Sequence, residues 1–308
     1  MNPKPHLRPH IKRPREKNVT IIAGFQCVDG TVVCADTQET ISLGGNSSFK
    51  RRVPKLRFEQ YEGHGRELSG LDTAVAICGA GFGPFIDKIA DAVWSAAKIA
   101  SDLPEACDAA EQAIKELYAE FGNIYQTGAC PEVELIYSMK MKNESRLFHA
   151  TGPIVNEKQG YSTAGSGCYM AAYIAGQMYH EGMTVRQGLI LAAYVLFQTK
   201  EHADGCGGES HIALLRFLPE SSGLIGWNRA EEITNLLKHS QDAIGRLIVD
   251  HGNLRIRKAE FLQKGAAALD LLSDLREQVR EQLEDSDNFW EKLFDIKFDD
   301  LGLPKKLS

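Results

Sequence analysis

The feature that most constrains the fold is a pair of strand-forming segments joined by an aspartate and a glycine. Residues 19–36 are rich in β-branched side chains on both sides of Asp29-Gly30. Asp-Gly is one of the dipeptides that best tolerate the positive φ angles of a tight turn, and β-branched residues favour extended strands. The segment therefore predicts a β-hairpin.

The composition is that of an ordinary globular protein. The 308 residues are 43% hydrophobic and 25% charged, and the net charge is -6. A general nucleic-acid binder would be basic, and no apolar run approaches the roughly 20 residues that span a bilayer. We therefore expect no nucleic-acid partner and no membrane association.

The seven cysteines indicate a reducing compartment. Their number is odd, they are scattered, and none forms a CxxC pair, which is typical of free thiols rather than of a disulfide framework or a zinc site. We expect a cytoplasmic protein that uses no metal and no organic cofactor. The cysteines stand at positions 27, 34, 78, 107, 130, 168 and 206.

The first 19 residues differ from the rest of the chain. They contain six Lys and Arg, one Glu and four prolines, and the prolines prevent a helix. The apolar stretch of a secretory signal does not follow. Two interpretations stay open: residues 1–19 are a disordered basic tail, or they are a propeptide that masks Thr20.

Hydrophobic periodicity organises residues 20–217 into strands, two helices, strands, two helices and a strand. The polar, glycine-containing residues 37–51 predict a loop. Asp102 and Thr184 are the expected N-caps of two helices, and Gly182 is an expected C-cap. The order lacks the strict alternation of a parallel βαβ sheet and favours helix layers on both faces of two antiparallel sheets. Helices are expected at about 84–101, 104–121, 167–181 and 184–202, and further strands at about 73–78, 132–141, 147–150, 160–163 and 210–217.

Residues 218–308 predict a helical C-terminal extension. Amphipathic helices are expected at about 229–249 and 255–285. The second of them carries an apolar stripe at helical spacing, which serves either internal packing or a partner site. The stripe consists of Leu262, Ala266, Leu269, Leu272, Leu275, Val279 and Leu283.

A glycine-rich turn after the strand at 73–78 requires comparison with the dinucleotide-binding fingerprint. Gly79 and Gly81 match its first two glycines, but Pro84 stands where the third is required. A second helix then follows where a βαβ unit needs a strand. The sequence therefore disfavours dinucleotide binding.

Several short motifs occur in the same order as in proteasome β-type subunits, which are N-terminal-nucleophile (Ntn) hydrolases. A threonine stands at the start of the hairpin, an aspartate ends it, and a Pro-Lys-Leu sequence and a Gly-Ser-Gly turn follow. Over about residues 20–215 the chain therefore resembles this family. The matching motifs are Thr20, Asp36, Pro54-Lys55-Leu56, Ile77-Cys78-Gly79, Gly165-Ser166-Gly167 and Gly207-Gly208.

The resemblance implies both a fold and a set of site residues. The fold is a four-layer αββα sandwich of the α+β class, to which the helical extension is added. The activity is that of a threonine peptidase in which an N-terminal threonine is the nucleophile. The implied catalytic residues are Thr20, Asp36, Lys55, Ser166 and Asp204, with Thr40 lining the substrate cleft through its backbone and the N–H of Gly79 forming the oxyanion hole.

The chemistry of an N-terminal threonine explains why these residue types occur together. A hydroxyl needs a base at neutral pH, and a free α-amino group, with an ordinary pKa of about 8, can accept its proton. A nearby lysine favours the unprotonated amine, and an aspartate holds that lysine in place and keeps it charged. Backbone N–H groups stabilise the tetrahedral oxyanion by about 3–4 kcal/mol.

Each of these residues also has an ordinary structural explanation. Thr20 fits the start of a strand, and Asp36 fits the turn after one. Lys55 follows a basic run that would usually be a solvated face, and Ser166 between two glycines fits a helix N-cap. The ordered set of motifs favours the catalytic interpretation for Thr20, Asp36 and Lys55.

Departures from the family pattern support an alternative. Thr20 is preceded by Val19 rather than by the glycine of self-processing precursors, and Cys206 and Gln38 replace a serine and an arginine. The β-branched Val19 resists the strained backbone that self-cleavage requires. The alternative is a non-catalytic ring or scaffold subunit with an unprocessed N-terminus, and a third hypothesis is an amidase that acts on small, non-peptide substrates.

The resemblance also implies partners. As a peptidase, the protein would form a ring with other copies of itself or with related subunits. It would cut unfolded polypeptides that a partner ATPase unfoldase delivers.

Overall fold

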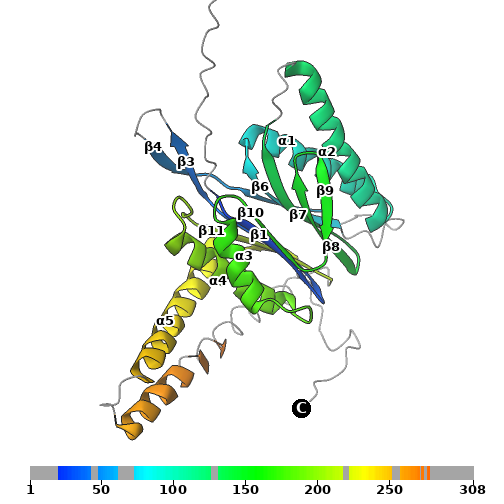
Figure 1. Ribbon diagram of the computed structural model, residues 1–308. Coiled ribbons are helices and arrows are strands. Elements are labelled where there is room, and N and C mark those ends of the chain that lie inside the picture. Colours follow the sequence, from blue (N-terminus) through cyan, green and yellow to red (C-terminus); the bar gives the residue numbers. More distant parts are fainter. Residues whose placement is uncertain are drawn as a thin grey trace, which may run out of the picture.

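The computed structural model describes residues 20–42, 48–61, 73–125, 131–217, 222–251, 257–270, 272–273 and 276–277. Its main body has four layers: two five-stranded antiparallel sheets lie face to face, and a pair of helices covers the outer face of each (Figure 1). The expected αββα sandwich is confirmed.

The first sheet has the strand order β10-β1-β2-β11-β12, and the second has the order β5-β6-β7-β8-β9. The strands of the first sheet are β1 (Ile22–Cys27), β2 (Gly30–Asp36), β10 (Tyr161–Ala164), β11 (Ser210–Arg216) and β12 (Gly223–Ile225). Those of the second are β5 (Leu56–Tyr61), β6 (Thr73–Gly81), β7 (Val133–Met141), β8 (Glu144–Thr151) and β9 (Ile154–Lys158). The helices are α1 (Gly83–Ile99), α2 (Leu103–Tyr125), α3 (Cys168–Met178), α4 (Val185–His202) and α5 (Trp227–His251).

The hairpin predicted around Asp29-Gly30 is confirmed as β1 and β2. The two strands pair from Ile22 with Ala35 to Cys27 with Gly30. Gly30 adopts a φ of +148°, a conformation that L side chains rarely adopt. Since β1 also pairs with β10 and β2 with β11, the hairpin lies at the centre of the first sheet.

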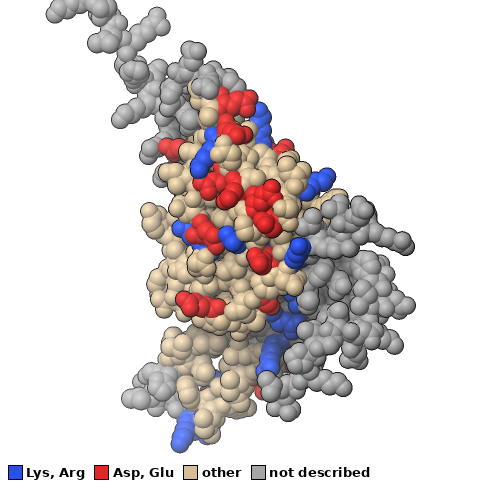
Figure 2. Space-filling view, turned by 90° about the vertical axis from the view of Figure 1, so that its right-hand side faces the viewer, with Lys and Arg blue, Asp and Glu red and all other residues tan. Residues whose placement is uncertain are grey.

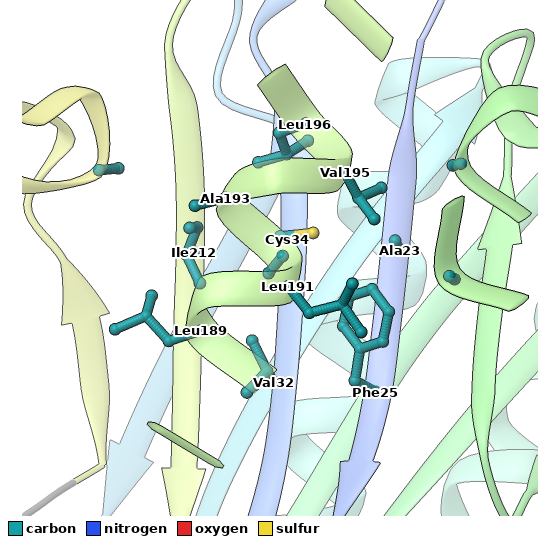
Figure 3. Close-up of a cluster of buried hydrophobic side chains, with 14 of the residues drawn as sticks. Ala23, Phe25, Val32, Cys34, Leu189, Leu191, Ala193, Val195, Leu196 and Ile212 are labelled. Atoms are coloured by element: carbon teal, nitrogen blue, oxygen red, sulfur yellow. The ribbon is translucent and has the colours of Figure 1, made fainter. Parts of the chain in front are cut away.

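The β2 strand is buried on both faces, and its side chains alternate between two cores. Val32 and Cys34 belong to the core that the first sheet forms with α3 and α4, which Figure 3 shows. Val33 and Ala35 belong to the opposite core, between the two sheets. The period of two that defines a strand therefore places the hairpin in the interior of the molecule.

Many of the side chains in the layer between the two sheets are small. Ala74, Ala76 and Cys78 on β6 face this layer. A Cβ atom added to Gly24 on β1 would lie only 2.6 Å from a methyl group of Leu147 on β8. The second sheet therefore approaches the hairpin closely enough to bring residues of both sheets to one site.

The helix ends show which sequence signals hold. Thr184 caps α4 in a reciprocal capping box with Gln187, and the Asp102 carboxylate accepts a hydrogen bond of 2.9 Å from the N–H of Glu105 in the first turn of α2. Both predicted N-caps are thus confirmed. The predicted C-cap at Gly182 is wrong, because α3 ends at Met178.

The prediction of a loop at residues 37–51 is wrong. This segment forms β3 (Gln38–Ser42) and β4 (Ser48–Arg52), which pair as a separate two-stranded sheet. Its polar composition suits a ribbon that stands away from the main sheets, as Figure 1 shows. The short strands β5, β9 and β12 were not predicted either. All three are edge strands. Nearly all of their side chains are exposed or only partly buried, which leaves little hydrophobic periodicity.

The first part of the C-terminal extension joins the main body. Ala230 and Ile233 on α5 are buried in the core beneath α4, and β12 adds a strand to the first sheet. The division expected at residues 217 and 218 is therefore not marked by a break in this sheet. The later part of α5 and the helical residues 258–270 project away from the main body (Figure 1).

The apolar stripe of the extension is exposed where the structure describes it. Leu262 and Leu269 are 59% and 67% exposed, so internal packing does not cover these two side chains. Leu275, Val279 and Leu283 lie outside the described residues.

The surface near α1 and α2 is acidic rather than basic. Glu105, Asp108, Glu116 and Glu120 are exposed along α2, and Figure 2 shows carboxylates spread over this face with scattered Lys and Arg. Within the described part of the chain, no helix is long and apolar enough to cross a membrane.

Candidate active site

The described structure brings Thr20, Asp36 and Lys55 into direct contact. Thr20 leads into β1, Asp36 ends the neighbouring strand β2, and Lys55 immediately precedes β5 of the other sheet. The Lys55 ammonium lies 2.6 Å from the Thr20 hydroxyl oxygen and 2.7 Å from the Asp36 carboxylate. It also donates to the carbonyl oxygen of Gln38. A single cation therefore connects the hydroxyl and the carboxylate.

Asp36 is held in place by several donors. Its side chain is fully buried, and that of Lys55 is only 9% exposed. One carboxylate oxygen accepts hydrogen bonds from Lys55 and from the N–H of Ile21 (3.2 Å), and the other accepts from the N–H of Gly207 (2.9 Å). Burial raises the pKa of Asp36 above its ordinary value, and the charge and hydrogen bond of Lys55 oppose that rise. The carboxylate is therefore fixed, and its charge depends on Lys55.

Lys55 is thus not part of a solvated basic face. The preceding residues Arg51 and Arg52 pair instead with Glu39 and Glu209 at the surface. Val53 and Pro54 separate these exposed cations from the buried one along the chain.

Ser166 contacts the backbone of Thr20, whereas Lys55 contacts its hydroxyl. Its hydroxyl oxygen accepts a hydrogen bond of 3.0 Å from the backbone nitrogen of Thr20 and lies 3.3 Å from the Thr20 carbonyl oxygen. The N–H of Gly167 donates to the same carbonyl at 3.1 Å. The N-cap of α3 is Gly167, so Ser166 does not serve as the cap, and its hydroxyl contacts the atom that would become the α-amine.

The turn that presents Ser166 depends on a glycine and on a carboxylate. Gly165 has a φ of +85°, which favours glycine, and a Cβ atom there would lie 2.4 Å from the carbonyl oxygen of Thr20. The N–H of Gly165 donates to the Glu134 carboxylate at 3.0 Å. Nothing in the sequence pattern had singled out Glu134 of β7.

Cys206 contacts the described residues around Thr20, whereas Asp204 does not bond to them. Asp204 is exposed and makes no hydrogen bond with the other described site residues, so its catalytic role stays a prediction from sequence. Cys206 is buried, and burial, with the Asp36 charge, raises the pKa of its thiol to about 11 while a hydrogen bond with Ser166 opposes the rise. The Cys206 thiol therefore contacts Ser166, and it stands at the position where the resemblance implies a serine.

Thr40 and Gly79, the two residues expected to bind substrate, both lie on strands. Thr40 lies within β3 and pairs with Lys50 of β4. The N–H of Gly79 on β6 donates to the Lys55 carbonyl at 3.4 Å, the long end of the usual range. Gly79 is thus beside Lys55, and its role as oxyanion donor stays a prediction.

The centre of the site is the Thr20 hydroxyl, the Lys55 ammonium and the Asp36 carboxylate. In the part of the chain that the structure describes, no three His, Cys, Asp or Glu side chains are grouped as metal ligands. The arrangement is suited to proton transfer around a nucleophilic hydroxyl.

Solved structures of Anbu share this fold. The protein described as "Anbu (ancestral beta-subunit) from Yersinia bercovieri" aligns with a TM-score of 0.57 and 14% identity over 74% of this chain and 97% of that one. Anbu from Hyphomicrobium sp. strain MC1 aligns with a TM-score of 0.57 and 14% identity over 75% and 97%. The structure described as "Helical Assembly of the Anbu Complex from Pseudomonas aeruginosa" aligns with a TM-score of 0.55 and 11% identity over 74% and 96%.

Comparison by sequence adds no relative: no protein-family model and no curated protein matches the chain. The structural likeness, at these identities, establishes the fold. The chain therefore has the proteasome-like Ntn-hydrolase fold, to which its C-terminal extension is added.

Proposed function

We propose that this protein is a threonine peptidase whose nucleophile is Thr20, acting within a proteasome-like oligomer. The single observation that carries the proposal is the position of the Lys55 ammonium between the Thr20 hydroxyl (2.6 Å) and the buried Asp36 carboxylate (2.7 Å). On this proposal residues 1–19 are a propeptide, and cleavage between Val19 and Thr20 releases the α-amine that serves as base.

The first half of the reaction forms a tetrahedral intermediate. The hydroxyl oxygen of Thr20 bonds to the carbonyl carbon of the scissile peptide, and its proton moves to the free α-amine, directly or through water. Lys55 stabilises the developing negative charge on the hydroxyl oxygen, and Asp36 keeps the ammonium oriented. Ser166, 3.0 Å from the nitrogen of Thr20, orients the amine toward the hydroxyl.

The second half releases the products. The amine returns its proton to the leaving nitrogen and the C–N bond breaks, which leaves an ester on Thr20. Water then hydrolyses this ester and restores the threonine. The N–H of Gly79 and the backbone around Thr40 would bind the substrate. Because the bond from Gly79 to the Lys55 carbonyl is long, an oxyanion with a full charge would compete with it effectively. The resemblance adds Asp204 to the catalytic set, and this addition is tested separately by Asp204→Asn.

The proposed partners and location follow from the fold, from the resemblance and from the free cysteines. The Pseudomonas aeruginosa Anbu structure is described as a helical assembly, which supports self-association of this chain, in a ring or a related arrangement. The substrates would be unfolded polypeptides supplied by an ATPase unfoldase. The cysteines within the described residues are free thiols, which supports a cytoplasmic location. We further propose that residues 20–217 form the hydrolase unit and residues 218–308 its extension.

The experiment that tests this proposal begins with the N-terminus. Intact mass and N-terminal sequencing of the purified protein are expected to show a chain that starts at Thr20. A Thr20→Ala variant is expected to lose peptide hydrolysis and labelling by threonine-directed electrophiles. Thr151→Ala, at an exposed strand end, is the matched control and should leave both unchanged.

The other outcomes separate the competing hypotheses. An intact N-terminus with no labelling of Thr20 would leave the hydroxyl without its base and would identify a non-catalytic ring or scaffold subunit. A processed chain that hydrolyses small amides but no peptides would identify an amidase with the same nucleophile.

A further inference from the structure

Gln38 touches the Lys55–Asp36 pair through its backbone and a neighbouring segment through its side chain. It is the first residue of β3 and stands two positions after Asp36. Its carbonyl oxygen accepts a hydrogen bond from the Lys55 ammonium. Its N–H donates to the carbonyl of Gly207 at 3.0 Å, and its side-chain amide donates to the carbonyl of Gly205.

The segment that Gln38 binds, residues 203–209 between α4 and β11, serves the site directly. The N–H of Gly207 donates to the second carboxylate oxygen of Asp36 at 2.9 Å. The neighbouring Cys206 contacts Ser166. A displacement of this segment would therefore change the environment of Asp36 and of Ser166 together.

The two ends of this segment are held by different groups. Near β11, the Lys200 ammonium donates to the carbonyl of Gly208 at 3.1 Å, and the Thr37 hydroxyl accepts from the N–H of Glu209 at 2.8 Å. Near α4, the side chain that reaches Gly205 is that of Gln38. The fit is close, because a Cβ atom on Gly207 would lie 2.6 Å from the Gln38 amide oxygen.

We propose that Gln38 is a positioning residue: its side-chain amide fixes residues 205–207 so that the N–H of Gly207 remains bonded to Asp36, and Asp36 in turn holds Lys55 against Thr20. The inference deepens the proposed peptidase function and depends on it for its catalytic consequence. A neutral amide suits this position because it donates to a carbonyl oxygen without placing a second cation beside Lys55.

The test uses Gln38→Met in the full-length protein, because methionine has a similar length but no hydrogen-bond donor. We expect kcat for peptide hydrolysis to fall about tenfold, the effect of one lost positioning hydrogen bond, with KM within about twofold. The acidic limb of the pH–rate profile should move to higher pH, since the bond from Gly207 lowers the pKa of Asp36.

The matched control is Gln26→Met. The amide of Gln26 also donates to backbone carbonyls, those of Cys27, Gly30 and Ser145, but at the far end of the hairpin from Thr20. It should leave the pH–rate profile in place. A Gln38→Met enzyme with the profile of the wild type would overturn the proposal, because a purely structural role would change stability without moving that profile.

A second measurement keeps the test independent of hydrolysis. Chemical unfolding across the acidic range measures how the free energy of unfolding depends on the protonation of Asp36. The pKa of Asp36 is raised in the folded protein, so its contribution to stability is present in acid and is lost as pH rises through that pKa. In Gln38→Met this loss should extend to higher pH than in the wild type. If the wild type hydrolyses no peptide but this shift occurs, the proposed function fails while the positioning of Asp36 stands. Identical unfolding curves would overturn the positioning role whatever the activity.

Discussion

The two sides of the Thr20 site are built differently. On the lysine side, Asp36 is fully buried and receives three donors, and the Lys55 side chain is 9% exposed. On the serine side, Ser166 is exposed, and its hydroxyl contacts the backbone of Thr20.

This difference in burial has an electrostatic reason on the lysine side and, on the serine side, a reason in the proposed mechanism. A buried carboxylate and ammonium are stable only when their charges are paired and their hydrogen bonds are complete. The serine side contacts the nitrogen of Thr20, and in the proposed mechanism this nitrogen exchanges a proton while substrate and water enter beside it. We therefore expect changes on the lysine side to affect both stability and activity, and changes on the serine side to affect mainly activity.

The largest effect is expected for Lys55→Met. Hydrolysis should fall on the order of 10³-fold or more, as when one member of a coupled catalytic set is removed. Asp36 would be left buried without its cation, which should lower the free energy of unfolding by about 3–5 kcal/mol at neutral pH. Peptide assays and urea unfolding measure the two losses. The exposed Lys50 offers a control, Lys50→Met, that should change neither; a fully stable Lys55→Met protein would contradict the comparison.

The pH dependence of that loss sharpens the comparison. Because Lys55 opposes the raised pKa of Asp36, its removal raises this pKa further. A raised folded pKa gives stability that is present in acid and is lost as pH rises through it. The deficit of Lys55→Met against the wild type should therefore be small near pH 4 and grow toward neutral pH. Urea unfolding at several pH values measures it, and a deficit that is constant with pH would exclude Asp36 as its source.

Ser166→Ala should have a smaller and different effect. Loss of the hydroxyl removes one hydrogen bond to the nitrogen of Thr20, which should lower kcat about tenfold. Because Ser166 is exposed, the free energy of unfolding should change by less than about 1 kcal/mol. Ser95→Ala on α1, another exposed serine, controls for loss of a hydroxyl. A loss of stability as large as that of Lys55→Met would remove the contrast between the two sides.

The smallest effect is expected for Asp204→Asn. The resemblance places Asp204 in the catalytic set, whereas the structure leaves it exposed and without a hydrogen bond to the other described site residues. On the geometry, kcat should stay within about twofold of the wild type. Steady-state kinetics decides between the two expectations, and a tenfold loss would return Asp204 to the catalytic set.

The sequence predicted the elements whose signals are local. Asp29-Gly30 identified the hairpin because few residues tolerate its backbone, and Thr184 identified a helix start because its side chain caps the first turn. The ribbon of β3 and β4 was missed, since its polar residues lack the alternation that burial produces. Gly182 was misassigned as a C-cap because α3 ends earlier, at Met178.

The order of Thr20, Asp36 and Lys55 along the chain was enough to nominate them, because each belongs to a motif of fixed residue type. Only the tertiary structure showed that the N–H of Gly207 donates to Asp36 and that the carbonyl oxygen of Gln38 accepts from Lys55. It also showed that Glu134 supports the turn of Ser166. Every residue carries the same backbone N–H and carbonyl, so sequence does not reveal which of them is directed at a buried charge. That direction is set by which segments the fold brings together: β11 pairs with β2, although the two strands are far apart in the chain, and this pairing places Gly207 beside Asp36.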